Sequence, residues 1–296
     1  MRTATKQFVE LRPGGLNYRA SPNLVEFSVQ VRTRFKTLII PYLLFKVTGQ
    51  TSPVEQARIR AIASDHASDW LNAVPVSTLG LKLDNNSIRV AVGLRLGTKI
   101  CESHRCTCGQ LVDPWGRHGL CCKNAKGTHS RHAQINDLIR RSLASSGVPA
   151  VLEPTGLSRG DGKRPDGMTL FPWSGGKNAV WDFTCRDTLA SSHTTSTSKE
   201  AGAAASQAEV AKSTLYNNLV NNYGIIPVAM ETLGSWGPKG KKFIEEIGDR
   251  IALATGEKRA KYFLFQAISM AAQRGNVSSI LGTAPNSKKM DEIYYL

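Results

Sequence analysis

The segment that decides the fold is DGMTLFPWSGGKNAVWDFTC, residues 166–185. It contains two strand-like runs, 166–171 and 179–185, and the residues between them include Gly175 and Gly176, which suit a tight hairpin turn. Each run carries an aspartate, Asp166 at the start of the first and Asp182 inside the second. We therefore expect a β-hairpin with one carboxylate on each strand.

The elements around this hairpin alternate between helix and strand. A helix with Ile135, Leu138, Ile139 and Leu143 on one face precedes a short strand at 148–153. After the hairpin, an alanine-rich helix leads to a strand at 225–230, where Pro227 favours an edge position or a bulge. The expected apolar stripe of the alanine-rich helix is Ala204, Ala208, Ala211, Leu215 and Leu219.

The resulting order over residues 128–231 is helix, strand, strand, strand, helix, strand. This order predicts an α/β fold with a mixed sheet flanked by helices, because helices and strands alternate along the chain. It is the core order of restriction-like nucleases, and other α/β folds share it.

The regions outside this core are mostly helical. Alternating apolar residues at 25–31 predict a strand, in an otherwise unassigned segment over 1–51. Ser52, Pro53 and Glu55 predict the start of a helix whose face includes Ile59, Ile62, His66 and Trp70, and a second helix is expected at 87–96. We divide residues 52–296 into a helical segment (52–100), a cysteine-rich module (101–127), the core (128–231) and a helical extension (232–296). Helices are expected at 238–254 and 258–274 in the extension.

The chain is strongly basic. Its formal net charge is +15, and residues 95–141 hold nine Lys and Arg against three Asp and Glu. Positive charge of this kind favours polyanionic partners, since contact with phosphates releases counterions. Nucleic acid is therefore the expected partner, with an acidic membrane surface or plain solubility as the alternatives.

The cysteines predict an intracellular metal-binding protein. Five of the six lie between residues 101 and 122, whereas the disulfides of a secreted domain would be spread along the chain. No signal peptide or membrane span is evident, so we expect an intracellular protein with no membrane partner. Nuclear residence would follow from function only, and the oligomeric state is left open.

The cysteine cluster has the composition of a zinc site. Cys106, Cys108, His118 and Cys122 surround a turn-rich loop, and four such ligands suit tetrahedral zinc with a structural role. Several neighbours are alternative ligands: Cys121, Cys101, His104, His129 and His132. The other interpretation is a set of reduced cysteines packed as small apolar residues.

The carboxylates of the core are candidate ligands for a different metal. Glu153, Asp166 and Asp182 lie on three successive expected strands, and oxygen ligands of this kind suit Mg²⁺ or Mn²⁺ in phosphodiester hydrolysis. Asp182 is the strongest candidate ligand of the three, because burying a carboxylate between apolar residues is costly unless it is paired or metal-bound. The alternative is a turn residue after proline at Asp166 and an edge-strand charge at Asp182 in contact with Arg186.

Basic and aromatic residues near these carboxylates are further candidates. Lys212 and Tyr216 share one face of the alanine-rich helix, where a lysine can stabilise developing negative charge. Arg131, His132 and Arg164 are candidate nucleic-acid contacts, although Arg131 and His132 also suit a place beside the zinc site or on plain surface.

At these residues the chain resembles the C-terminal region of non-LTR (LINE-like) retrotransposon polyproteins, in which a restriction-like endonuclease follows a reverse transcriptase. The resemblance covers roughly residues 55–283, although the chain carries no reverse-transcriptase signature. The matching stretches are Trp70-Leu71, Gly93-Leu94-Arg95-Leu96-Gly97, Cys106-Thr107-Cys108-Gly109, Gly116-Arg117-His118-Gly119-Leu120-Cys121-Cys122, Ser130-Arg131-His132, Glu153-Pro154, Arg164-Pro165-Asp166, Trp181-Asp182-Phe183-Thr184, Gln273-Arg274-Gly275-Asn276 and Leu281-Gly282.

The resemblance implies a zinc knuckle followed by a PD-(D/E)XK-type nuclease core. The zinc ligands would be Cys106, Cys108, His118 and Cys122, and Asp166 and Asp182 would bind the catalytic metal. It further implies Glu153 as a helper and Lys212 as the catalytic lysine, moved to the helix. In such elements the domain nicks target DNA, and the new 3′ end primes reverse transcription.

The sequence departs from that pattern at Thr184, where the general nuclease motif has lysine, and at Leu215, where the family has a second helix lysine. From the resemblance as a whole we expect a retrotransposon-derived, metal-dependent DNA endonuclease with structural zinc and catalytic Mg²⁺ or Mn²⁺. The alternative is a catalytically degenerate zinc-containing module that binds DNA or RNA, which these departures favour.

Overall fold

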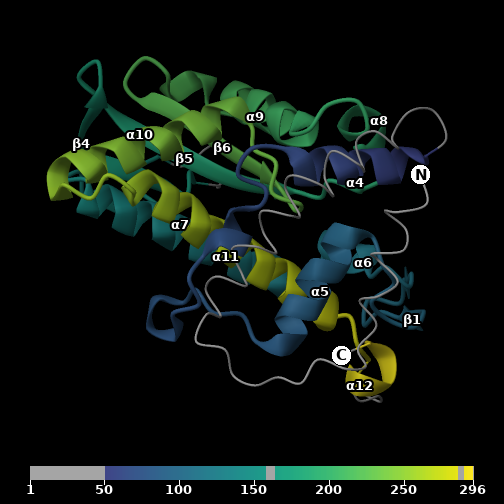
Figure 1. Cartoon of the computed structure of the whole chain (residues 1–296). Coiled ribbons are helices and arrows are strands. Elements are labelled where there is room, and N and C mark those ends of the chain that lie inside the picture. The colour runs from purple at the N-terminus through teal and green to yellow at the C-terminus, as the bar shows by residue number, and fades with distance from the viewer. Residues whose placement is uncertain (1–50, 158–163, 286–289, 296) are drawn as a thin grey trace, which may run out of the picture.

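The computed structural model describes residues 51–157, 164–285 and 290–295, and Figure 1 shows how their helices and strands are arranged. A four-stranded sheet with helices packed against it lies in one half, and shorter helices with a two-stranded ribbon lie in the other. The strand expected at 25–31 lies outside the described residues.

The sheet is mixed. It contains β3 (Ala150–Leu152), β4 (Gly167–Ser174), β5 (Lys177–Arg186) and β6 (Gly224–Glu231), in that spatial order. The β3–β4 and β4–β5 pairs are antiparallel, whereas β5 and β6 are parallel. Helix α7 (Lys126–Ser145) precedes β3, and α9 (Ala203–Leu215) lies between β5 and β6 in the chain. The predicted order of elements and the mixed sheet are therefore confirmed.

The hairpin and the edge strand form where the sequence places them. Gly175 and Gly176 have φ values of 57° and 74° and connect the paired residues Ser174 and Lys177. Both angles lie in the left-handed region that glycine adopts without strain. Pro227 lies on β6, which pairs with β5 alone and so forms an edge of the sheet. An edge strand tolerates the missing N–H of proline.

Helices α7 and α9 pack through different kinds of side chain. Ile135, Ile139 and Leu143 of α7 are fully buried in the core cluster that contains Trp181. In α9 only the first turns present alanines to the sheet, so the predicted apolar stripe is wrong beyond Ala208: Ala211 and Leu215 are exposed. The last turn of α9 instead faces the sheet through Lys212 and the Tyr216 that follows it.

Two N-terminal helices begin with the caps that their sequences indicate. The Ser52 hydroxyl accepts a hydrogen bond from Glu55 N at the start of α4 (Pro53–Ala63), and Asp84 caps α5 (Asn85–Leu96). The expected continuation of α4 to Trp70 is wrong. The helix ends at Ala63, His66 turns the chain with a φ of 65°, and Trp70 lies in the short 3₁₀ helix η2 (Asp69–Asn72).

The remaining described elements are the C-terminal helices and several short helices and strands. Helix α10 (Pro238–Thr255) matches its expected range within a residue, and α11 (Ala260–Leu281) extends beyond the expected end at 274. The short elements are η3 (Ser77–Leu79), β1 (His104–Arg105), β2 (Leu111–Val112), α6 (Arg117–Cys121), α8 (Thr194–Thr197), η4 (Asn217–Leu219) and α12 (Met290–Ile293).

Helix α11 connects the two hydrophobic cores. Its first half packs in the core of the sheet and its second half packs with α5 and the cysteine-rich module. It crosses α7 at glycines: a Cβ on Gly127 would lie 2.3 Å from Ser279 N, and one on Gly275 would lie 2.3 Å from Arg131 Cβ. This close crossing fixes the start of α7, which carries His132, relative to the cysteine-rich module.

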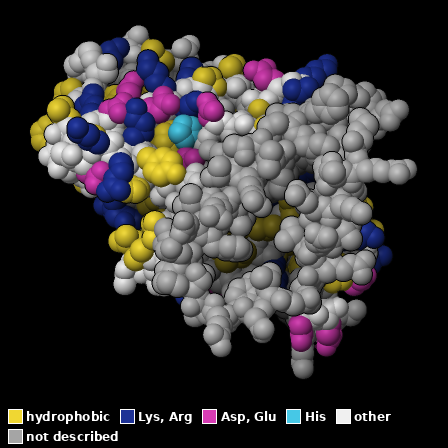
Figure 2. All heavy atoms as spheres, viewed as in Figure 1, with side chains coloured by type: hydrophobic (Ala, Val, Ile, Leu, Met, Phe, Trp, Pro, Cys, Tyr) yellow, Lys and Arg dark blue, Asp and Glu magenta, His cyan; other side chains and the backbone are white. Residues whose placement is uncertain are grey.

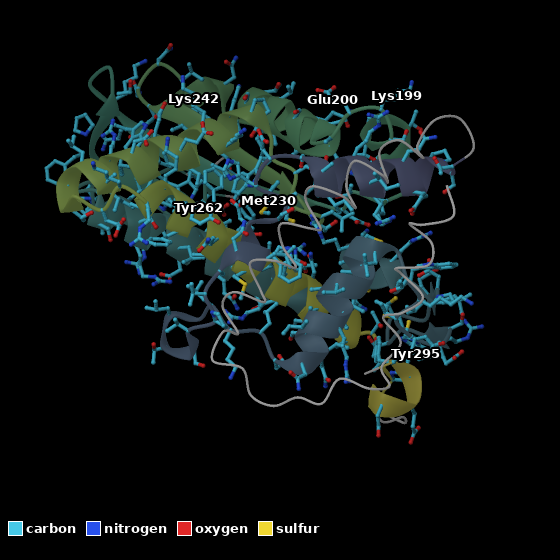
Figure 3. The ribbon with its side chains drawn as sticks, in the orientation of Figure 1. Lys199, Glu200, Met230, Lys242, Tyr262 and Tyr295 are labelled. Atoms are coloured by element: carbon cyan, nitrogen blue, oxygen red, sulfur yellow. The ribbon has the colours of Figure 1, made fainter. Side chains whose placement is uncertain are left out.

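Figure 3 shows side chains across the whole molecule. Met230 lies in the interior and is 1% exposed, whereas Lys242 on α10 lies at the periphery. Around α10, Figure 2 shows Lys and Arg side chains interleaved with Asp and Glu. Among the described residues, no helix combines the length and the apolar character that a membrane span requires.

Candidate zinc and carboxylate sites beside one cavity

The cysteine-rich module brings its four predicted ligands together. Strands β1 and β2 form a small ribbon, and Cys106 N donates a 2.8 Å hydrogen bond to Gln110 O across its turn. Helix α6 then returns His118 and Cys122 to that turn. The ligand atoms of Cys106, Cys108, His118 and Cys122 all lie within 4.8 Å of one another.

The spacing of these atoms fits a zinc ion. Cys106 Sγ and Cys122 Sγ are 3.8 Å apart, the separation that tetrahedral zinc with bonds of about 2.3 Å imposes on two sulfurs. Cys108 Sγ and His118 Nε2 are 3.1 Å apart, closer than the roughly 3.6 Å of such a site. A Cys₃His group of this geometry can bind a metal such as zinc after a small separation of that second pair.

The alternative ligands lie elsewhere. Cys121 is exposed, and its thiol lies 3.5 Å from His118 O. The Cys101 thiol faces the carbonyl oxygen of Asp113 at 3.4 Å, and His104 Nε2 lies 3.0 Å from the Thr283 hydroxyl.

The second candidate site is centred on Asp182. This residue lies in β5 and is 6% exposed, so its carboxylate requires partners. Lys212 Nζ lies 2.7 Å from Oδ1, and the Tyr216 hydroxyl donates to Oδ2. Both partners come from the C-terminal end of α9, as their i, i+4 spacing predicted.

Asp166 immediately precedes β4 and lies beside Asp182 of β5. Its backbone N–H donates to Trp181 O at 3.1 Å, and its Oδ2 accepts a 2.6 Å hydrogen bond from Phe183 N. Because Trp181 and Phe183 flank Asp182 in the chain, these bonds hold the two aspartates next to each other. Asp182 lies on β5 as expected, whereas Asp166, expected at the start of the other hairpin strand, lies one residue before β4.

His132 connects α7 to this site. Its Nε2 lies 3.1 Å from Asp166 Oδ2, and its ring centroid lies 5.8 Å from that of Phe183. The hydrogen bond to Asp166 raises the pKa of His132, and the negative charges of Asp166 and Asp182 add to that effect. When it is protonated, the His132 imidazole adds its positive charge to that of the Lys212 ammonium beside the two aspartates.

The remaining predicted residues lie outside this cluster. Glu153 is exposed with a φ of 46°, and only its backbone, through a 2.9 Å hydrogen bond to Asp166 O, connects it to the site. Arg131 is 3% exposed and donates to Asn276 Oδ1, so it holds α7 against α11 instead of lying on the surface. Arg164 is exposed, and Leu215 is 49% exposed.

The expected convergence of three carboxylates is not met by this geometry. Among the described residues, the one group of three or more metal-type ligands within 4.8 Å is the Cys₃His cluster. Glu153 follows β3 and has a left-handed backbone conformation. Asp166 and Asp182 alone remain candidate ligands of the core.

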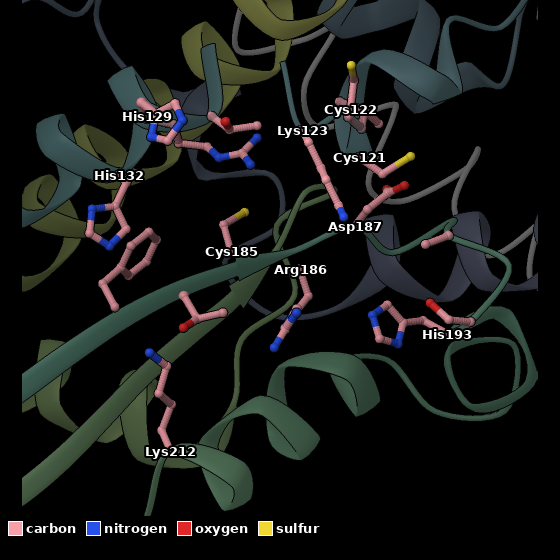
Figure 4. A pocket seen from close by; sticks show the side chains of 17 residues that line it. Cys121, Cys122, Lys123, His129, His132, Cys185, Arg186, Asp187, His193 and Lys212 are labelled. Atoms are coloured by element: carbon pink, nitrogen blue, oxygen red, sulfur yellow. The ribbon is translucent and has the colours of Figure 1, made fainter. Parts of the chain in front are cut away.

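A cavity of about 800 Å³ lies between the two candidate sites (Figure 4). One wall comes from α6 and the start of α7, and includes Cys122, Lys123 and His132. The opposite wall comes from the end of β5 and the loop after it, and Lys212 lies on the side of the carboxylates. Sequence reasoning missed this cavity, since its walls are far apart in the chain.

Comparisons with known proteins add no relative. Neither the models of known protein families nor the curated protein sequences match this chain.

Proposed function

We propose that this protein is a metal-dependent DNA endonuclease with a restriction-like core and a structural zinc module. The observation that carries the proposal is the pair of aspartates, Asp182 on β5 and Asp166 just before β4 and bonded to β5, with Lys212 in contact with Asp182. The order of strands, with the two antiparallel pairs and the parallel edge, supports the restriction-like assignment. The resemblance to the endonuclease region of non-LTR retrotransposons supports DNA nicking as the reaction.

Asp166 and Asp182 are the residues that would hold a catalytic Mg²⁺ or Mn²⁺. Such an ion supplies Lewis-acid activation of the phosphate and of a water molecule when it is bound. An ion at Asp182 would compete with Lys212 for Oδ1, whereas Tyr216 donates to Oδ2. Once displaced, Lys212 would be free to face the scissile phosphate, and Tyr216 would still orient the carboxylate.

The proposed reaction is hydrolysis of one phosphodiester bond. A water oxygen attacks phosphorus, the bond from phosphorus to O3′ breaks, and O3′ takes up a proton to give a 3′ hydroxyl and a 5′ phosphate. Lys212, freed from Asp182, stabilises the negative charge that develops on the phosphate oxygens. Phe183 N and His132 both contact Oδ2 of Asp166 and orient that carboxylate.

The zinc module has a structural role in this proposal. Four protein ligands leave no open position on the ion, and the strands β1 and β2 are too short to form a core of their own. Zinc at Cys106, Cys108, His118 and Cys122 would therefore stabilise the fold of residues 101–127.

The second candidate function is nucleic-acid binding without cutting. Thr184 stands where the nuclease motif has lysine, and the described carboxylates form no three-ligand group. Both observations favour a degenerate nuclease fold that uses its basic residues to bind DNA or RNA.

Plasmid nicking separates the two functions. Purified protein is incubated with supercoiled plasmid and Mg²⁺ or Mn²⁺, beside Asp182→Ala and a matched control, Asp249→Ala, at an exposed position on α10. The endonuclease predicts nicking that is lost in Asp182→Ala and kept in the control. Nicking that survives Asp182→Ala contradicts the mechanism, and DNA binding without any nicking supports the second function.

A further inference from the structure

The cavity between the two candidate sites is lined by basic side chains that the proposed mechanism does not use. Lys123 follows the zinc-site residue Cys122, and Arg186 and His193 lie on the opposite wall. In Figure 4 Lys123 extends across the cavity towards the end of β5. The positive charges of Lys123 and Arg186, from two separate segments of the chain, therefore face one space.

These basic groups are available to a ligand. Arg186 and Lys123 are exposed, and within residues 51–157, 164–285 and 290–295 no salt bridge or hydrogen bond is formed by either side chain. Other arginines of the chain, such as Arg140, Arg141 and Arg259, pair with a nearby carboxylate. A cation that faces a cavity without a carboxylate partner is suited to an anion from outside.

The acidic residue of the cavity does not neutralise them. Asp187 is 8% exposed, and its Oδ1 accepts hydrogen bonds from Leu189 N at 3.2 Å and from the Thr232 hydroxyl at 3.0 Å. Burial raises the pKa of Asp187. The Asp187 carboxylate is thus bonded to the protein groups that form the wall of the cavity.

The position of Arg186 relates the cavity to the carboxylate site. Asp182 and Arg186 are four residues apart on β5, so their side chains leave the same face about 13 Å apart along the strand. This separation exceeds the reach of a single phosphate group. A backbone that places one phosphate at Asp182 must place a different phosphate at Arg186.

We propose that the cavity is a subsite for the sugar–phosphate backbone of DNA, in which Arg186 and Lys123 contact a phosphate beside the one that is cut. The proposal rests on the proposed endonuclease function for the identity of the strand. It assigns a second role to the zinc module, which forms the wall that carries Lys123. The phosphates are shared by DNA and RNA, so the contact itself is independent of base sequence.

The test measures binding in the full chain with Asp182→Asn throughout, so that cutting does not consume the DNA. The double variant Arg186→Gln, Lys123→Gln is compared with Arg89→Gln, Lys258→Gln, which removes two exposed cations remote from the cavity lining. Fluorescence anisotropy of a labelled DNA duplex gives the Kd as a function of salt concentration. Arg186→Lys with Lys123→Arg is the charge-conserving variant.

We expect the first double variant to raise Kd by at least about tenfold and to lower the slope of log Kd against log salt by about 0.9, the value for one lost phosphate contact. The charge-conserving variant restores most of the affinity, and a labelled RNA duplex shows the same loss. Equal Kd values and slopes in the cavity and control variants overturn the subsite.

The outcome is distinguishable from failure of the endonuclease proposal. Weaker binding in the cavity variant, together with no plasmid nicking by the unsubstituted protein, supports the subsite and rejects the nuclease. Nicking with an unchanged KM in Arg186→Gln, Lys123→Gln rejects the subsite and retains the nuclease.

Discussion

The Lys212 ammonium lies 2.7 Å from Asp182 Oδ1, and this contact connects α9 to the strand that carries the candidate catalytic carboxylate. Lys212 is a quarter exposed and Asp182 is buried, so the lysine compensates a charge that would otherwise be costly in the interior. It also occupies the oxygen that a metal ion would need. Lysine and metal therefore compete for one carboxylate.

The competition predicts opposite effects of Lys212→Met on metal binding and cutting. Mn²⁺ affinity, measured by isothermal titration calorimetry, should increase several-fold because Oδ1 is free. Nicking should fall by about 100-fold or more, because the charge that stabilises the transition state is lost. Lys241→Met, which breaks the 3.1 Å pair with the exposed Asp65, should change neither quantity. Unchanged Mn²⁺ affinity in Lys212→Met would contradict the competition.

Tyr216 predicts a stability effect at the same carboxylate. Its hydroxyl donates to Asp182 Oδ2 while its ring is 1% exposed. Tyr216→Phe leaves a buried acceptor without this donor, and we expect a loss of about 1 to 3 kcal/mol in the free energy of unfolding by urea. Tyr262→Phe, at a 43% exposed position, is the control and should cost little. Equal stability of the two variants would show that the Tyr216 bond is not formed.

The zinc site predicts different outcomes for neighbouring cysteines. Cys122→Ser should lower the zinc content, measured by mass spectrometry, and the Tm by about 10 °C, since a structural zinc contributes directly to folding. Cys121→Ser is a matched control, because Cys121 is exposed and lies outside the ligand group. Full zinc content in Cys122→Ser with loss in Cys121→Ser would reverse the ligand assignment.

Glu231 predicts a pH dependence of stability. It is fully buried, and its Oε1 accepts a 3.0 Å hydrogen bond from Ala204 N at the start of α9. Burial raises the pKa of Glu231 to about 7 from 4.5. The unfolded chain ionises first as pH rises, so the contribution of Glu231 is fully present below about pH 4.5 and is lost by about pH 7.

The loss attributable to Glu231 is on the order of 3 kcal/mol over that interval. The side chain in Glu231→Gln does not titrate. The free energy of unfolding by urea, taken as variant minus unsubstituted protein, should therefore be larger at pH 8 than at pH 5. Glu200→Gln, at an exposed position, should keep the original pH profile. An identical profile in Glu231→Gln would mean that this carboxyl is ionised in the folded protein.

The core could be predicted from sequence because its signals are local. The paired glycines of the hairpin, the periodic apolar face of α7 and the proline of β6 each depend on nearby residues, and all appear in the structure. The i, i+4 spacing of Lys212 and Tyr216 likewise predicted a shared face.

The features that sequence did not reveal depend on distant packing. Arg131 is of a residue type that often contacts phosphates, but the close crossing of α7 and α11 buries it against Asn276. The contact of His132 with Asp166 also requires α7 to be placed relative to β4. His66 ends the α4 region with a positive φ that its apolar periodicity does not indicate.

The central claim is that Asp166 and Asp182 bind one metal ion at the site of cutting. Anomalous diffraction from a crystal soaked in Mn²⁺ tests it most directly. The account predicts a manganese peak within about 2.0 to 2.6 Å of an oxygen of each aspartate, with Lys212 displaced from Asp182. Manganese absent from these two carboxylates at full soaking, with Lys212 still paired to Asp182, would contradict it.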